Sequence, residues 1–435
     1  MTETIPVTEQ HGLPTSFCII PWLHLNVNPL GDVLQCCISS SKGEVGNLKH
    51  NTLAEIWNND PMKSLRLKLL NGDKPASCLK CFEQEENGIP SFRQGINRRY
   101  EPHLSSATAA TNSDGSVDQM TLRYWDFRFS NLCNMKCRMC CHDFSSAWHA
   151  DMIKIAGPHS VPANAVINVT DTSVDDLHRV IDEQIDNVEE IYFAGGEPLI
   201  MDEHYYILEK LIERGRCDVR LRYNTNLLKI RYKHWDNIEL WKNFDSVTVF
   251  ASLDAFGSRA EYIRSGTVWN TIDENIRRLV AEPAISFFIA PTVQALNLLH
   301  IPDLIDYLIS CGINPRHIRI NNVLTTPTYF HINTLSPAYR ELASSKFAAH
   351  VAQQQIAHVA DDLNTQYRGI LSYMEPDASM DEAYMADIKR KFYRNVVDLD
   401  RIRGEIFLNT FPELADHLEQ AAQQIKVDEA TGRTW

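Results

Sequence analysis

The chain lacks the features that would place it outside the cell, in a membrane or on a nucleic acid. Its first ten residues hold neither a basic stretch nor an apolar run, so we expect no signal peptide. No apolar run approaches the length of a membrane span. Positive charge is in deficit, with 42 Lys and Arg against 56 Asp and Glu and a formal net charge of −14. That balance disfavours general nucleic-acid binding, because the surface would repel a phosphate backbone.

The cysteines lack the spread of a disulfide framework. Most of the 11 cysteines stand in short clusters. In a chain without a secretion signal, such clusters are typical of metal ligands, and we expect a protein of the reducing cytoplasm. Among the 16 histidines, only His142 stands beside a cysteine cluster at metal-ligand spacing, and we interpret it as a polar neighbour.

One cluster is a CxxxCxxC motif that directly follows a strand-like run. Cys133, Cys137 and Cys140 can bind three corners of a cubane iron–sulfur cluster and leave the fourth iron without a protein ligand. Electron-transfer clusters normally have four protein ligands, whereas an open metal position is where substrate chemistry occurs. Zinc is the alternative, although a structural zinc site would need a fourth ligand. We interpret the adjacent Cys141 as a structural neighbour.

The middle of the chain alternates between strand-like and helix-like patterns, which predicts an α/β fold with a parallel sheet. Short apolar or alternating runs indicate the strands, and longer amphipathic patterns indicate the helices. The predicted strands are 121–130, 188–194, 218–225, 246–253, 285–293 and 317–323, and the predicted helices between them include 174–185, 203–214, 271–281 and 301–311. Beyond residue 335 the chain is predicted to be helical, including 339–359 and 380–397.

A second motif, Ala194-Gly195-Gly196-Glu197-Pro198, ends the second predicted strand. Together with the cysteine motif it resembles the radical S-adenosylmethionine (radical SAM) enzymes, over roughly 118–326. The resemblance implies a partial (β/α)6 barrel whose strand ends carry the chemistry. It also implies a SAM-binding 4Fe–4S cluster whose open iron binds S-adenosylmethionine. A one-electron donor such as flavodoxin or ferredoxin would reduce that cluster.

The resemblance also implies a set of cofactor-binding residues. The carbonyls of the two glycines and the Glu197 carboxylate would accept hydrogen bonds from the methionine ammonium. Arg264 would pair with the methionine carboxylate, because a guanidinium fork binds carboxylate oxygens in pairs. No catalytic residue is assigned beyond the cluster ligands. The full set is Gly195, Gly196, Glu197, Asn224, Ser252, Asp254, Arg264 and Val293.

Three members of this set also have a structural interpretation. Asn224 could be part of a polar turn, Arg264 part of a surface salt bridge, and Val293 an ordinary core residue.

The N-terminal cysteines form a second predicted site. Cys18 is followed by twelve residues, Gly31, four residues and Cys36, and Cys78 and Cys81 come later in a CxxC motif. The pattern resembles the SPASM/twitch domain that binds an auxiliary 4Fe–4S cluster, although that domain follows the barrel in better-known peptide maturases. A zinc ribbon is the alternative. Cys37 competes with Cys36, but the spacing from Gly31 favours Cys36.

These observations predict four segments and one activity. We expect a SPASM/twitch-like module over 1–100, a linker over 101–117, the barrel over 118–330 and a helical extension over 331–435. The resemblance implies a 5′-deoxyadenosyl radical that abstracts hydrogen from a substrate, with a peptide as our first choice. A small metabolite is the alternative substrate. A non-catalytic iron–sulfur or zinc scaffold is the rival interpretation, and it would not need the cofactor-binding set.

Overall fold

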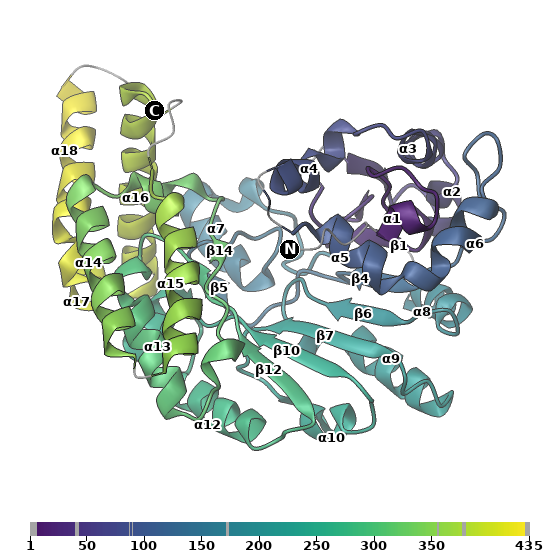
Figure 1. The fold of residues 1–435 in the computed structure, drawn as a ribbon. Helices are drawn as coiled ribbons and strands as arrows, with labels where there is room; N and C mark the ends of the chain where they lie inside the picture. Colours follow the sequence, from purple (N-terminus) through teal and green to yellow (C-terminus); the bar gives the residue numbers. More distant parts are fainter. Residues whose placement is uncertain are drawn as a thin grey trace. The chain divides into compact units, whose positions relative to one another are not determined.

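The computed structural model describes residues 7–39, 43–86, 88, 90–170, 174–354, 356–375 and 380–430 (Figure 1). Contacts divide the chain into two compact units. The predicted boundaries at 100 and 330 remain predictions, because residues 118–330 contribute to both units. Unit 1 comprises Met1–Asn131, Val166–Tyr223 and Asn243–Ser246, and unit 2 comprises Leu132–Ala165, Asn224–Lys242 and Val247–Trp435.

Unit 1 is built on strands that stand in the order β3-β2-β1-β4-β6-β7. Strands β1, β4, β6 and β7 are parallel neighbours, whereas β2 and β3 follow β1 as antiparallel strands. The N-terminal segment thus extends the sheet at β4, a pairing that the sequence does not reveal. The strands span His24–Val27 (β1), Asp32–Leu34 (β2), Glu44–Asn47 (β3), Tyr124–Phe127 (β4), Glu190–Phe193 (β6) and Arg220–Thr225 (β7).

Helices join and cover these strands. Helix α9 (Asp202–Glu213) connects β6 to β7, as a parallel pair requires, and its buried residues recur at helical spacing. Helix α8 (Val174–Gln184) precedes β6. The segment expected as a linker instead contains α6 (Leu104–Ala109), because the Leu104 side chain is fully buried. The remaining helices of at least five residues are α2 (Leu53–Trp57), α3 (Asp60–Leu70), α4 (Leu79–Glu86) and α5 (Phe92–Arg99).

Unit 2 contains two parallel strand pairs. Strands β10 (Val247–Ala251) and β12 (Ile285–Ile289) are joined through α12 (Trp269–Val280). Strands β13 (Thr292–Val293) and β14 (Asn322–Val323) are joined through α13 (Ile301–Ser310). The predicted strand 285–293 is therefore two strands. Pro291 separates them, because proline has no amide hydrogen to donate.

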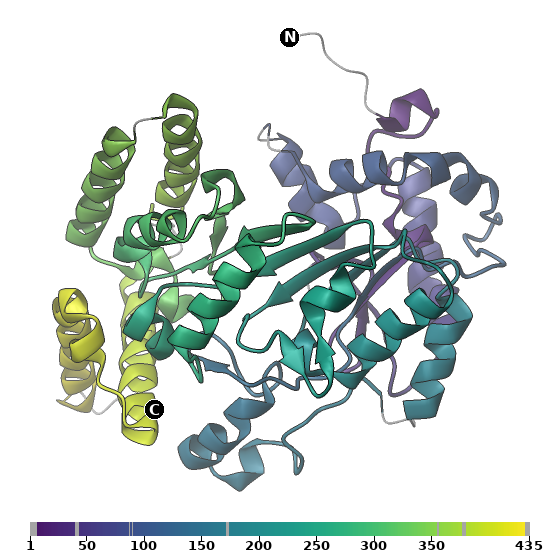
Figure 2. The same ribbon diagram turned by 90° about the horizontal axis from the view of Figure 1, so that it is seen from below.

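The C-terminal part of unit 2 is helical, as predicted. Helices α14 (Pro337–Gln353) and α15 (Ala357–Ser372) pack together, as do α16 (Glu382–Arg403) and α18 (Ala415–Ala430) (Figures 1 and 2). The single helix predicted over 339–359 is wrong, because α14 ends at Gln353. Within the described residues, no helix is long and apolar enough to cross a membrane.

Candidate metal centres and cofactor site

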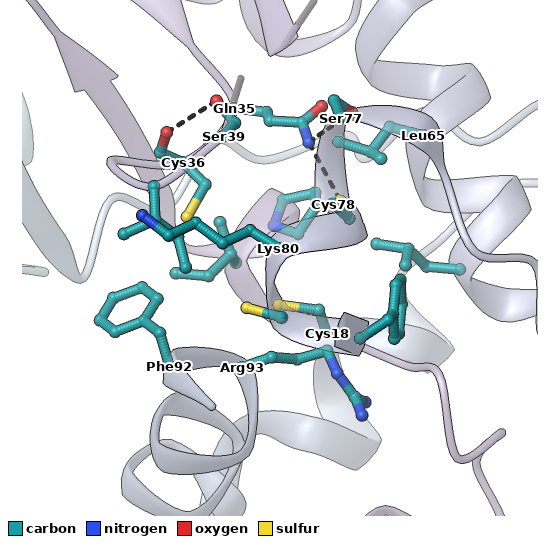
Figure 3. A pocket seen from close by; sticks show the side chains of 16 residues that line it. Cys18, Gln35, Cys36, Ser39, Leu65, Ser77, Cys78, Lys80, Phe92 and Arg93 are labelled. Atoms are coloured by element: carbon teal, nitrogen blue, oxygen red, sulfur yellow. Dashed lines mark hydrogen bonds between the residues drawn. The ribbon is translucent and has the colours of Figure 1, made fainter. Parts of the chain in front are cut away.

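Four cysteines of unit 1 line one pocket, as the sequence predicts (Figure 3). Cys18 precedes a 3₁₀ turn, Cys36 follows β2, and Cys78 and Cys81 lie at the junction with α4. In Figure 3 the side chains of Cys18, Cys36 and Cys78 point into a shared space. We call Cys18, Cys36, Cys78 and Cys81 the N-terminal cysteine site.

The pocket distinguishes Cys36 from its neighbour. Cys36 lines the pocket, and Cys37 does not. Of these two cysteines, the one that lines the pocket is the one that the spacing from Gly31 favours.

The thiols of the N-terminal cysteine site are buried, which suits a bound metal group whose positive charge would stabilise thiolates. Burial raises the pKa of Cys18 to about 12 and raises those of Cys78 and Cys81, so these thiols resist ionisation on their own. The Gln35 amide donates to Cys78 Sγ at 3.1 Å. Bound irons would offset the burial penalty, because metal binding deprotonates its thiol ligands.

Within the described ranges, no three His, Cys, Asp or Glu side chains are grouped closely enough to hold a single metal ion.

The second set of cysteines lies in unit 2 on residues 132–140, which we call the cysteine loop. Strand β5 (Lys136–Cys137) in this loop pairs antiparallel with β11 (Arg264–Ser265), and Cys137 lies opposite Arg264. The Cys137 carbonyl accepts hydrogen bonds from Trp148 Nε1 and from the Cys140 amide, each at 2.9 Å. The Cys133 amide donates to Ser146 Oγ at 3.2 Å. Backbone contacts therefore fix all three predicted ligands.

The thiols of this loop lie in a buried, charged environment. Burial raises the pKa of Cys140, and the neighbouring Cys137 adds to the shift. Burial also raises the pKa of Cys137, whereas the positive charge of Arg264 opposes that shift. The Cys141 carbonyl accepts hydrogen bonds from the Phe144 and Ser145 amides, which gives this residue a structural role in the following turn.

Arg264 is a buried residue that joins two predicted site residues. Its Nε and one terminal nitrogen donate to the two Asp254 carboxylate oxygens, at 2.8 and 3.1 Å. The other terminal nitrogen lies 3.7 Å from Cys137 Sγ. The Asp254 side chain is fully buried and that of Arg264 is 14% exposed, so the interpretation as a surface salt bridge is wrong. Burial alone would lower the pKa of Arg264, but Asp254 and then Cys137 raise it above its usual value.

Neighbouring backbone holds the Asp254 carboxylate in place. The Thr292 amide on β13 donates to Asp254 Oδ1 at 2.8 Å, and Asn297 Nδ2 donates to the Asp254 carbonyl at 3.0 Å. Val293, next to Thr292, is fully buried. The Ser252 amide donates to the Thr225 carbonyl at 2.9 Å. The structure thus brings Asp254, Arg264 and Cys137 together and places Val293 on the strand that holds Asp254.

The end of β7 contributes a residue that sequence reasoning missed. Asn224 is exposed, whereas Asn226 is buried and its amide nitrogen donates to Asn134 Oδ1 of the cysteine loop at 2.7 Å. The only sequence signal for Asn226 is its place in the polar turn that includes Asn224.

The glycine motif lies in unit 1, after β6. Gly195 has φ +80°, and a Cβ atom there would lie 2.5 Å from Arg128 Cβ, so only glycine fits. Gly196 also has a positive φ, +49°. Glu197 is buried, and its Oε1 accepts from the Leu199 amide at 3.1 Å.

One face of the sheet in unit 1 is polar and buried. Asn26 on β1 lies directly opposite Asp126 on β4, and both side chains are at least 97% buried. Asp126 Oδ1 pairs with Arg128 Nε at 3.4 Å. Asp126 Oδ2 and Asn26 Nδ2 have no hydrogen-bond partner in the described part of the chain. An acceptor on β4 and a donor on β1 therefore share one register position of the sheet.

Two family models match the chain over these segments. Residues 18–82 match SPASM, the iron–sulfur cluster-binding domain, and residues 127–308 match the radical SAM superfamily. The chain thus contains one segment similar to radical SAM domains and one similar to SPASM iron–sulfur domains. These domains imply a 4Fe–4S cluster, S-adenosylmethionine and a further iron–sulfur cluster as cofactors.

Solved structures give more distant likenesses. The structure described as native anSMEcpe with bound AdoMet is 14% identical, covers 64% of this chain and has a TM-score of 0.33. This chain spans 60% of that one, less than two thirds of its length. The structure of TYW1 with a lysine–pyruvate adduct is 11% identical, with 54% and 72% of the two chains covered and a TM-score of 0.29. At these TM-scores neither likeness carries an argument, and no curated protein matches the chain.

The N-terminal cysteine site makes a prediction about iron content. Anaerobically reconstituted protein should approach about eight iron atoms per chain, because two 4Fe–4S clusters are expected. Cys36→Ser should lose about half of that iron, whereas the matched control Cys37→Ser should retain it. Iron analysis with metal mass spectrometry measures both. Zinc bound tightly at Cys18, Cys36, Cys78 and Cys81 would contradict the auxiliary-cluster assignment.

Proposed function

We propose that the cysteine loop holds the cluster that binds S-adenosylmethionine and that the enzyme abstracts hydrogen from a peptide substrate. The observation that supports this most directly is the joint placement of the loop with Arg264 and Asp254 in unit 2. A purely structural metal site would not need a buried arginine fork beside a ligand thiol. The rival interpretation as a scaffold leaves that arrangement unexplained.

The chain's own residues would bind and orient the cofactors. When bound, the cluster and S-adenosylmethionine supply a 5′-deoxyadenosyl radical, and an external one-electron donor such as a flavodoxin or ferredoxin supplies the electron. Cys133, Cys137 and Cys140 would supply three thiolates, which leaves one iron for the methionine group. The Arg264 guanidinium would place its positive charge beside the methionine group of the cofactor. Its two hydrogen bonds to Asp254 fix the direction of the guanidinium.

The remaining predicted residues would contact other parts of the cofactor. Gly195 and Gly196 would expose carbonyls to the methionine ammonium, with the Glu197 carboxylate as a further acceptor. Ser252 would contact the ribose, Val293 would pack near the adenine, and Asn224 would be a further cofactor contact at the end of β7.

The polar face of unit 1 supports a peptide as the substrate. A peptide group offers one N–H donor and one carbonyl acceptor. Asp126 Oδ2 could accept from the first and Asn26 Nδ2 could donate to the second. A buried polar atom without a partner costs about 1–3 kcal/mol, so a ligand that satisfies both atoms gains affinity. A small metabolite with an amide group offers the same chemistry and is the alternative.

The role of Arg264 gives a binding prediction. Arg264→Lys keeps the charge but loses the paired hydrogen bonds to Asp254 that fix the direction of that charge, so the affinity for S-adenosylmethionine should fall by roughly 1.5–3 kcal/mol. Calorimetry on the anaerobic, reconstituted protein measures this directly. The control is Arg277→Lys on α12, whose side chain is 57% exposed, and it should bind normally. Equal affinity in both variants would remove Arg264 from the cofactor site.

The two cysteine sites should differ in cofactor cleavage. Changing Cys133, Cys137 and Cys140 to Ala should abolish all 5′-deoxyadenosine formation, because no open iron would remain. Changing Cys78 and Cys81 to Ala should leave the slow cleavage that occurs without substrate, while substrate turnover stops. Chromatography of 5′-deoxyadenosine measures cofactor cleavage in both variants.

Loss of the auxiliary cluster can also destabilise its own small fold, so only soluble protein is compared. Its remaining cluster must still give a reduced spin-resonance signal. A soluble Cys78/Cys81 variant that cleaves no cofactor would refute the division of roles between the two sites.

A further inference from the structure

The cysteine loop is connected to the far end of the chain through the two basic residues that flank Cys137. Arg138 has a fully buried side chain, and one of its terminal nitrogens donates to Asp400 at 2.5 Å and to Glu405 at 2.6 Å. Its guanidinium carbon also lies 3.6 Å from the centre of the Tyr262 ring. Both carboxylates belong to the C-terminal end of α16 and the residues just after it.

Lys136, on the other side of Cys137, reaches the same helix indirectly. Its Nζ lies 3.0 Å from Asp151 Oδ1, and Arg403 Nε donates to Asp151 Oδ2 at 2.8 Å. The side chains of Asp151 and Arg403 are only 2% and 1% exposed. The Arg403 guanidinium lies over the Trp148 ring, and Trp148 itself donates to the Cys137 carbonyl. Arg403 is the last residue of α16.

The carboxylate of Asp400 is fixed from the helix side as well. Oδ1 accepts from the Tyr262 hydroxyl at 2.7 Å, and Oδ2 accepts from the Phe407 amide at 2.6 Å. Gly404 ends the helix in the left-handed conformation, with φ +68°, and the chain then turns back to Glu405. Arg138 therefore contacts a rigid acceptor and not a mobile side chain.

We propose that the C-terminal end of α16 positions Cys137 for cluster binding, with Arg138 as the main positioning residue. The proposal rests on the proposed role of the cysteine loop as a cluster site. A loop binds its metal more tightly when contacts behind the ligand residues fix the direction of the ligand side chains. Loss of such a contact typically lowers the metal affinity about 10–100-fold. The helical extension thus has a role in cofactor binding, although it lies outside the residues that match the radical SAM model.

The test compares cluster retention in the reconstituted full-length protein. Arg138→Met removes the ion pair at similar volume, and the loop cluster should then lose iron to a chelator roughly 10- to 100-fold faster. Its reduced spin-resonance signal should also broaden. The auxiliary cluster is the internal reference and should lose iron at the wild-type rate. Arg401→Met is the matched control, because Arg401 lies on the same helix with a side chain that is 70% exposed.

Two further variants keep the test decisive. Adding Asp400→Asn and Glu405→Gln to Arg138→Met removes the unpaired carboxylates but not the loss of the ion pair, so the loop cluster should still lose iron faster than in the wild type. Retention restored to the wild-type rate would overturn the proposal, because the single variant would then have acted through its unpaired carboxylates. Asp400→Asn alone is gentler, since an amide can still contact Tyr262, and it should shift retention in the same direction as Arg138→Met.

Equal loop-cluster retention in Arg138→Met and Arg401→Met would overturn the proposal, as would loss of both clusters together. Failure of the underlying function would appear differently, as a wild-type protein whose cysteine loop binds no cluster.

Discussion

The short backbone ladder between β5 and β11 is the constraint on which the site in unit 2 depends. It places Cys137 opposite Arg264, so that a ligand thiol and a buried guanidinium share one register position. Asp254 binds Arg264 with both carboxylate oxygens, and the Thr292 amide holds that carboxylate in place. The cysteine loop also contacts Asp400 and Glu405 through Arg138, the residue that follows β5.

Local sequence patterns predicted the parts of the site that depend on spacing. The CxxxCxxC motif places three cysteines on one short loop, and the strand-like runs locate β4, β6, β7, β10 and β12 to within a few residues. The four cysteines predicted to bind an auxiliary cluster line one pocket, and their role as ligands stays a prediction. Strand positions can be predicted in this way because strand periodicity is a property of short segments.

The remaining features depend on contacts between distant segments. Arg138 and Asp400 are 262 positions apart in the sequence. The residues next to Arg138 in Cys-Arg-Met-Cys do not indicate that its side chain is buried or that it pairs with a carboxylate. Likewise, nothing in His24–Val27 indicates that β1 pairs with β4. A strand such as 285–293 was predicted too long because its hydrophobicity continues past the proline that divides it.

The central claim is that the cluster in the cysteine loop offers one iron to the cofactor. Electron–nuclear double resonance on the reduced protein, with S-adenosylmethionine labelled with ¹⁵N at its amino group, tests this most directly. The account predicts a strong nitrogen coupling that persists when Cys78 and Cys81 are replaced. It also predicts that the coupling disappears when Cys133, Cys137 and Cys140 are replaced. Absence of the coupling in the wild-type protein, or its persistence without the three loop cysteines, would contradict the account.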